Sequence, residues 1–209
     1  MVINKVIYCL VLMLALVQFI SCDPEKELSG ETTYNFSINS SISPSSDTIN
    51  IGDTLYLISS FPSQLRDTKT GSNINYSHSK AITSSIGFND FSKLGTNTDS
   101  STTKYFNFFT IEGDVYNDKT LPVYWQTNVI KYEEKNDGYY LKIGMIPKKS
   151  GVYAFGIANL GSAGQIGNKN DALFLVTFTH TNQHLHNYED QFGQLSEHDR
   201  GRTYCFVVR

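Results

Sequence analysis

The sequence reads Tyr139-Tyr140-Leu141-Lys142-Ile143-Gly144-Met145-Ile146 at residues 139–146. Apolar or aromatic side chains occupy every odd-numbered position of this octet, and the first three even-numbered positions carry Tyr, Lys and Gly. A two-residue period is typical of a strand with one buried face in an antiparallel sheet. The preceding Asn136-Asp137-Gly138 favours a turn, and Pro147 ends the strand because it lacks an N–H for the sheet. The octet therefore predicts a half-buried antiparallel strand.

Similar patterns recur on both sides of the octet, as short segments separated by polar turns. They cover residues 34–38, 53–61, 105–111, 123–132, 152–157, 173–178 and 204–208. The last two segments are apolar on both faces, so we expect them to be central strands. A convincing helical stripe is missing, and one short helix is expected near residues 188–195. Many short strands joined by polar turns favour a β-sandwich.

Length and composition favour one folded domain. The chain has 209 residues, of which 40% are hydrophobic, 13% aromatic and only 18% charged. These values exclude a disordered chain, which combines high charge with few aromatic residues. The formal net charge of -3 gives no general basic field, so we expect no nucleic-acid partner. Residues 62–103 are rich in Ser, Thr and Asn and are weakly patterned, so they are expected to form a long insertion in the sandwich.

The phrase from Lys149 to Phe155 contains Gly151 and Tyr153 in a Gly-x-Tyr arrangement. It resembles the tyrosine corner of immunoglobulin-like domains, in which a tyrosine hydroxyl bonds to the backbone a few residues upstream. Phe155 stands where antibody domains carry their second cysteine, so the likeness is to members without a disulfide. The resemblance implies an all-β fold, an antiparallel immunoglobulin-like β-sandwich formed by residues 34–209.

The N-terminus has the pattern of a secretory signal. Lys5 is the only charged residue before an almost wholly apolar stretch at residues 6–20. Fifteen residues are too few to span a bilayer comfortably, and they match the apolar region of a signal peptide. Residues 1–21 are therefore predicted to be a signal peptide. The alternative is a membrane anchor that stays uncleaved.

Phe19-Ile20-Ser21-Cys22 resembles a lipobox, the motif that ends bacterial lipoprotein signal peptides. Leucine is usual at its first position, so Phe19 departs from the pattern. The resemblance implies that the Cys22 sulfur is joined by a thioether to a diacylglycerol with palmitate-type acyl chains. The signal peptide is then cleaved before Cys22, which becomes the first residue of the mature protein. Each buried CH₂ contributes about 0.8 kcal/mol, so two or three acyl chains anchor a protein stably. The alternative is that Cys22 is an ordinary residue.

The residues after Cys22 are acidic and read Asp23-Pro24-Glu25-Lys26-Glu27. This run resembles the export signal of Bacteroidota surface lipoproteins, whereas an Asp there in enteric bacteria would indicate retention at the inner membrane. Residues 51–57 and 61–67 are also similar to a segment of uncharacterised Bacteroidota lipoproteins with immunoglobulin-like domains. These resemblances imply an outer-membrane, lipid-anchored protein on the cell surface, with residues 22–33 as a lipidated, flexible tether.

Three cysteines do not make a disulfide framework. Cys9 leaves with the signal peptide, Cys22 carries lipid, and Cys205 is then alone. Because Cys205 lies in an apolar run, we expect it to be a small buried hydrophobic residue rather than a reactive thiol.

One histidine cluster could carry chemistry. His180, His184 and His186 precede Glu189 and Asp190. On an extended segment the three histidines would share one face, as zinc ligands do. The surrounding segment reads as a polar loop, the His-Glu-x-x-His motif is missing, and so is the Gly-x-Ser-x-Gly elbow of hydrolases. We therefore expect no cofactor, metal or catalytic residue. An envelope hydrolase or metal-binding protein using this cluster is the alternative hypothesis.

Adjacent aromatic residues could form a sugar-binding surface. Tyr124 with Trp125, and Tyr139 with Tyr140, would point to opposite faces of a strand. An outward ring could stack on a sugar, but the favoured interpretation places Trp125 and Tyr139 in the core.

Asp-Thr-aliphatic triplets at Thr48 and Thr54 resemble the O-glycosylation pattern of Bacteroidota.

Together these patterns predict a lipid-anchored cell-envelope protein with a non-catalytic binding or structural role. Its expected partners are the membrane, through the lipid on Cys22, and a glycan or another envelope protein. The protein is not expected to be an enzyme.

Overall fold

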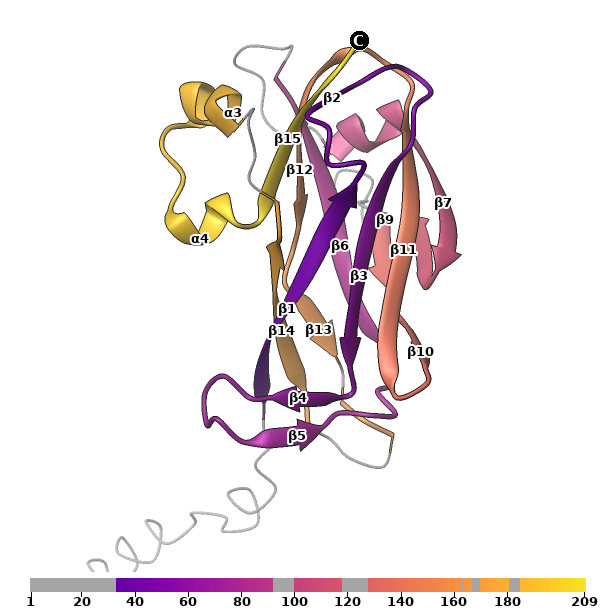
Figure 1. Cartoon of the computed structure of the whole chain (residues 1–209), viewed down its shortest axis with the longest axis vertical. Coiled ribbons are helices and arrows are strands. Elements are labelled where there is room, and N and C mark those ends of the chain that lie inside the picture. The colour runs from indigo at the N-terminus through magenta and orange to yellow at the C-terminus, as the bar shows by residue number, and fades with distance from the viewer. Residues whose placement is uncertain (1–32, 92–99, 118–127, 163, 167–169, 181–184) are drawn as a thin grey trace, which may run out of the picture. The chain divides into compact units, whose positions relative to one another are not determined.

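The structure is a computed structural model that describes residues 33–91, 100–117, 128–162, 164–166, 170–180 and 185–209. All of them belong to a compact unit that runs from Thr33 to Arg209, close to the predicted domain start at residue 34. Within this unit the chain forms an open, sandwich-like β-sheet (Figure 1). The expected all-β, immunoglobulin-like sandwich is thus confirmed as a fold class. In the described part of the chain no helix is both long and apolar enough to cross a bilayer.

The first layer is built around the strand predicted from the octet. Its strands follow the order β11 (Gly138–Pro147), β3 (Leu55–Pro62), β1 (Tyr34–Ser43) and β14 (Ala172–Phe178). Two further strands share the other edge of β11, namely β10 (Glu133–Lys135) and β7 (Phe106–Glu112). We call these six strands the β11 layer.

The second layer faces the first across the core. Its strands follow the order β8 (Asp114–Asn117), β9 (Asn128–Lys131), β6 (Ile82–Asp90), β12 (Gly151–Ile157), β15 (Thr203–Val208) and β2 (Thr48–Ile49). The two layers join where β13 (Leu160–Ser162) pairs with both β14 and β6. They also join at Gly113, whose φ of 76° turns the chain from β7 into β8.

Most strand pairs are antiparallel, as expected, but two are parallel. β1 pairs with β14 in parallel along seven positions, and β2 pairs with β15 in the same way. Parallel neighbours need a long connection between them. Most of the domain lies between β1 and β14 in the chain, so local patterning cannot reveal this pairing.

The alternation predicted for β11 is confirmed. Tyr139, Leu141, Ile143 and Met145 are buried against the second layer. The core that they join is rich in aromatic rings, which pack across the layers. Phe106 of β7 stacks on Phe88 of β6 with ring centroids 4.1 Å apart.

The segment 62–103, expected to be an insertion, is one only in part. Its first portion forms a separate hairpin, β4 (Gln64–Arg66) with β5 (Asn73–Asn75), across one end of the sandwich (Figure 1). Its next portion is β6, a full member of the second layer. Ile82, Ile86 and Phe88 of β6 are buried, while its other face carries small or polar residues. This outer face makes the strand look like a polar loop in the sequence.

Other expectations are refined by the structure. β14 is central, as expected, but only one of its faces is buried, because Leu173 on the outer face is 41% exposed. The strand expected at residues 123–132 begins as β9 at Asn128, and residues 123–127 lie outside the described residues. The expected short helix is present as α3 (Leu185–Phe192), followed by the single-turn α4 (Glu197–Arg200).

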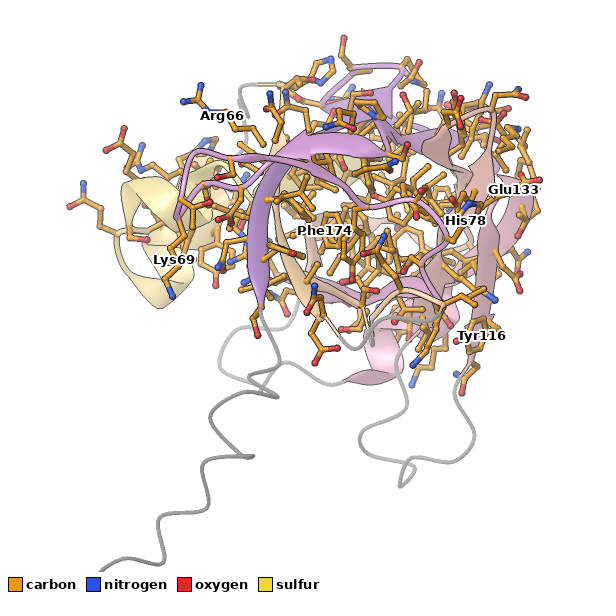
Figure 2. The ribbon with its side chains drawn as sticks, turned by 90° about the horizontal axis from the view of Figure 1, so that it is seen from below. Arg66, Lys69, His78, Tyr116, Glu133 and Phe174 are labelled. Carbon is orange, nitrogen blue, oxygen red and sulfur yellow. The ribbon has the colours of Figure 1, made fainter. Side chains whose placement is uncertain are left out.

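Asp67 attaches the β4–β5 hairpin to the start of β1. Its buried carboxylate accepts hydrogen bonds from the Thr70 hydroxyl at 2.6 Å, the Asn35 N–H at 2.8 Å and the Thr70 N–H at 2.9 Å. These bonds, led by the one from the Thr70 hydroxyl, lower the pKa of Asp67 to about 2. From below, Figure 2 shows Lys69 at one side of this end and His78 at the other, with Phe174 between them.

The predicted tyrosine corner is present. Tyr153 is fully buried, and its hydroxyl donates to the carbonyl oxygen of Lys149 at 3.1 Å. Burial raises the pKa of Tyr153, so the hydroxyl keeps its proton. A Cβ at Gly151 would lie 3.1 Å from the Tyr153 ring, so glycine leaves the space into which the ring folds back.

We predict that Tyr153→Phe lowers the free energy of unfolding by about 1 kcal/mol, because it removes a buried hydroxyl and leaves a carbonyl without its donor. Tyr140→Phe is the matched control, since Tyr140 lies on the outer face of β11 and should change stability by less than about 0.5 kcal/mol. Urea unfolding of both variants measures the difference. Equal effects would argue against a structural role for the corner.

Candidate binding surface

The predicted lipidation site lies outside the described residues. Cys22 and all but the last residue of the predicted tether at residues 22–33 precede Thr33, the first residue described. The described domain then begins almost at once with β1 at Tyr34. Lipidation of Cys22 therefore stays a prediction from the sequence.

The structure places two of the three candidate histidines. His180 follows β14 with Nδ1 3.2 Å from the Thr179 hydroxyl, and His186 is exposed on α3. His184 lies outside the described residues. Within the described parts of the chain, no three His, Cys, Asp or Glu side chains are grouped to hold a metal ion. A site that includes His184 stays an untested hypothesis.

Cys205 is fully buried in β15, which confirms its expected role as a small hydrophobic residue. Burial raises the pKa of its thiol to about 12, with a smaller contribution from the carboxylate of Asp47. The thiolate is the nucleophilic form of cysteine. At neutral pH Cys205 is therefore held in its unreactive form.

The other displaced pKa values also move away from neutrality. Burial raises the pKa of Tyr132 and of Tyr204 to about 12, and it is likewise the largest cause of the raised values of Tyr76, Tyr139 and Tyr188. A general acid or base works best with a pKa near the operating pH. These shifts hold each group more firmly in its resting protonation state, as structural groups require.

The end of the sandwich near β4–β5 holds a polar pocket of about 430 Å³. Two of its lining residues, Ser79 and Tyr139, belong to a hydrogen-bond network that continues to Tyr76 and Ser162. The Tyr139 hydroxyl donates to the Tyr76 carbonyl at 2.6 Å and accepts from the Ser79 N–H at 3.2 Å. The Tyr76 hydroxyl donates to Ser162 at 3.0 Å. This network closes the end of the core, so the hydroxyl of Tyr139 and the N–H of Ser79 are used by the fold and are not available to a ligand in the pocket.

The outer face of the β11 layer is the best candidate for binding. In Figure 1 its strands β3, β11 and β7 lie side by side. Tyr56 on β3, Gly144 on β11 and Phe109 on β7 occupy one row across these strands, because Gly144 pairs with both of the others. Phe109 is 38% exposed although it is a large apolar ring. We call the residues of this row, with Tyr140 and Lys142 of β11, the aromatic face.

The Phe109 ring lies directly on the backbone of Gly144. A Cβ built at Gly144 would come 2.2 Å from two carbons of that ring, so only glycine permits this contact. Tyr56 approaches the same ring edge-on from the other side, with centroids 6.2 Å apart. The side of the Phe109 ring that faces Gly144 is thus covered, while another part of the ring stays open to solvent. Such a ring is a flat apolar platform on a polar sheet.

Sequence reasoning found part of this surface. It placed Tyr139 and Tyr140 on opposite faces and favoured Tyr139 in the core, and Tyr139 is indeed buried while Tyr140 is half-buried on the outside. Tyr124 and Trp125 lie outside the described residues. Sequence reasoning did not identify Tyr56 and Phe109 as members of this surface. The position of Tyr56 between buried Leu55 and Leu57 was the available signal.

The two candidate glycosylation sites are accessible. Thr48 lies in the short strand β2, and Thr54 precedes β3 rather than lying within it, because that strand begins at Leu55. Both side chains are half-exposed. Their modification stays a prediction.

Comparison with known proteins gives distant structural likenesses only. No family model matches the chain, and no curated protein matches it. The fold is similar to a cohesin module from a family 33 glycoside hydrolase of Clostridium perfringens, with TM-score 0.35 and 12% identity over 68% of this chain and 98% of that one. It is also similar to the CupB6 tip adhesin of Pseudomonas aeruginosa, with TM-score 0.20 and 14% identity over 71% of this chain and 42% of that one. Likenesses at these TM-scores carry no argument about function.

We predict that Gly144→Ala lowers the free energy of unfolding by about 1–3 kcal/mol, because its Cβ overlaps the Phe109 ring and forces it to move. In the double variant Gly144→Ala/Phe109→Ala most of this added cost should disappear. Gly87→Ala is the matched control, since Gly87 also lies in a strand but a Cβ added there would have no atom within 4 Å. A double-mutant cycle by urea unfolding measures the coupling, and additive effects would contradict the contact.

Proposed function

We propose that this protein is a lipid-anchored binding protein of a bacterial outer membrane, exposed at the cell surface, which captures a glycan or an envelope protein without catalysing a reaction. The observation that carries the binding role is the aromatic face, where the Phe109 ring lies open on the Gly144 backbone. The pattern that carries the location is Phe19-Ile20-Ser21-Cys22.

The arrangement of polar groups supports binding over catalysis. The tyrosines and the cysteine with displaced pKa values all retain their protons at neutral pH. The Tyr139 and Tyr153 hydroxyls are also used in bonds that close turns and ends of the sandwich. A hydrolase needs a nucleophile or base tuned toward the working pH.

A glycan suits the aromatic face for a physical reason. The C–H side of a sugar ring is flat and weakly apolar, and an exposed aromatic ring offers a matching surface. Phe109 supplies such a ring, and it is held in place by Gly144 beneath it and Tyr56 beside it. Because the ring is already fixed, binding loses little side-chain freedom.

The anchor is tested by Cys22→Ala in the bacterial host. We expect this variant to lose all incorporation of a fatty-acid probe, because the thioether acceptor is gone. Cys205→Ala is the control and should be labelled like the parent, since Cys205 is buried in the domain. Continued labelling of Cys22→Ala would contradict the anchor. External protease on whole cells then tests exposure at the cell surface, where a surface domain is cleaved and an inward-facing one survives.

The glycan role is tested by affinity electrophoresis of the purified domain against polysaccharides of its host envelope. Phe109→Ala and Tyr56→Ala should each weaken retention by about tenfold, because each removes an aromatic contact. Tyr116→Ala is the matched control, since Tyr116 is 42% exposed on β8 in the other layer. Unchanged retention in both face variants would refute glycan binding at this surface.

A further inference from the structure

We infer that the free edge of β7 binds a second copy of this chain. The two β7 strands pair antiparallel about a two-fold axis and join two β11 layers into one continuous sheet. This self-association is separate from the proposed binding role and does not depend on it. Its basis is the backbone groups, the side chains and the charges of the edge.

β7 forms a free edge of the β11 layer. In Figure 1 it lies at the rim of this layer beside β11, and β11 is the only strand that pairs with it among the described residues. The opposite margin of the layer is closed, because β14 pairs with β13 there. A free strand edge presents N–H and C=O groups to which another strand can bond.

The register of β7 against β11 shows which backbone groups point outward. Bonded and non-bonded residue pairs alternate along an antiparallel ladder. The Lys148 N–H donates to the Tyr105 carbonyl at 2.8 Å, so Tyr105 and every second residue after it bond toward β11. Phe108 and Thr110 lie between these positions, so their N–H and C=O groups point away from β11. Within the described parts of the chain, no loop or helix bonds to these groups.

The side chains of this edge leave it unprotected. Proteins usually guard a free edge with charged side chains, prolines or bulges. From Phe106 to Thr110 the strand reads Phe-Asn-Phe-Phe-Thr, without a charge or a proline, and the bulge at Ile111 comes only after this stretch. Phe109 is 38% exposed and Ile111 is 48% exposed. The regular part of β7 is therefore an open, uncharged edge with apolar side chains.

Charge favours a second β7 strand in antiparallel orientation as the occupant. Exposed Lys104 lies just before β7, whereas Glu112 ends the strand and exposed Asp114 follows it. Antiparallel pairing of two β7 strands brings the basic end of each to the acidic end of the other, whereas parallel pairing brings like charges together. The outward groups of each strand also supply the donors and acceptors that the other needs. The edge is thus complementary to itself, as a two-fold interface requires.

Such a pair extends the aromatic face. The two-fold axis passes through the joined sheet, so the outer faces of both β11 layers lie on the same side of it. Phe109 lies on this outer face against Gly144. The aromatic faces of the two copies therefore adjoin across the axis, and a long ligand can contact both at once.

Sedimentation velocity of the chain from Asp23 to Arg209 tests the association, because this chain lacks Cys22 and contains the whole compact unit. The parent should dimerise with a Kd on the order of 10 μM, as suits a small interface. Thr110→Pro should raise the Kd at least about tenfold, since proline removes an outward N–H and leaves the bonds to β11 intact. Thr110→Ala is the matched control and should change the Kd by less than about threefold, because it keeps that N–H. Circular dichroism confirms that both variants fold.

Amide hydrogen exchange of the parent, resolved by residue, tests where the copies meet without any variant. At about 1 μM the N–H groups of Asn107 and Phe109 should exchange slowly because they bond to β11, and those of Phe108 and Thr110 should exchange fast. At about 100 μM exchange at Phe108 and Thr110 should slow by about fourfold, as a Kd of about 10 μM implies. A parent that stays monomeric at about 100 μM, similar Kd values for Thr110→Pro and Thr110→Ala, or no slowing at Phe108 and Thr110 would each overturn the inference.

Discussion

The pairing of β11 with β3 is the constraint on which the rest of the domain depends. Its register, from Gly138 opposite Pro62 to Met145 opposite Leu55, decides which side chains of both strands face the core. A shift by one residue would turn every buried side chain of β11 to the solvent. The same register places Tyr56 beside Gly144 on the outside. The pairing therefore sets the core and the candidate binding surface together.

Polar chemistry inside the sandwich serves the fold, and this leaves recognition to its surface. The tyrosine hydroxyls at 139 and 153 bond to backbone carbonyls at the edges of the core, and Asp67 gathers three donors where the hairpin meets β1. Buried polar groups must be paired because an unpaired one costs about 1–3 kcal/mol. Groups used in this way are not free to act on a ligand, whereas the Phe109 ring of the aromatic face is partly open to solvent.

Local chemistry explains which features were predictable. The octet of β11 alternates cleanly, Gly151 and Tyr153 are two residues apart, and Cys205 lies in an apolar run. The half-buried strand, the tyrosine corner and the buried cysteine were therefore predicted correctly. β6 was read as an insertion because its outward residues are small or polar. The parallel pairing of β1 with β14 and the contact of Phe109 with Gly144 join residues that are far apart in the chain. No local pattern carries that information.

The amino-acid sequence by itself determined the class of the domain, the inward and outward faces of its clearest strands, and the lipobox-like segment that precedes it. These features depend on the order of neighbouring residues, through side-chain alternation and short motifs. Only the tertiary structure decided which outward residues become neighbours. Tyr56, Phe109 and Lys142 come from three strands, and they meet because hydrogen bonding across the sheet fixes the register and a glycine removes the side chain that would keep the Phe109 ring away.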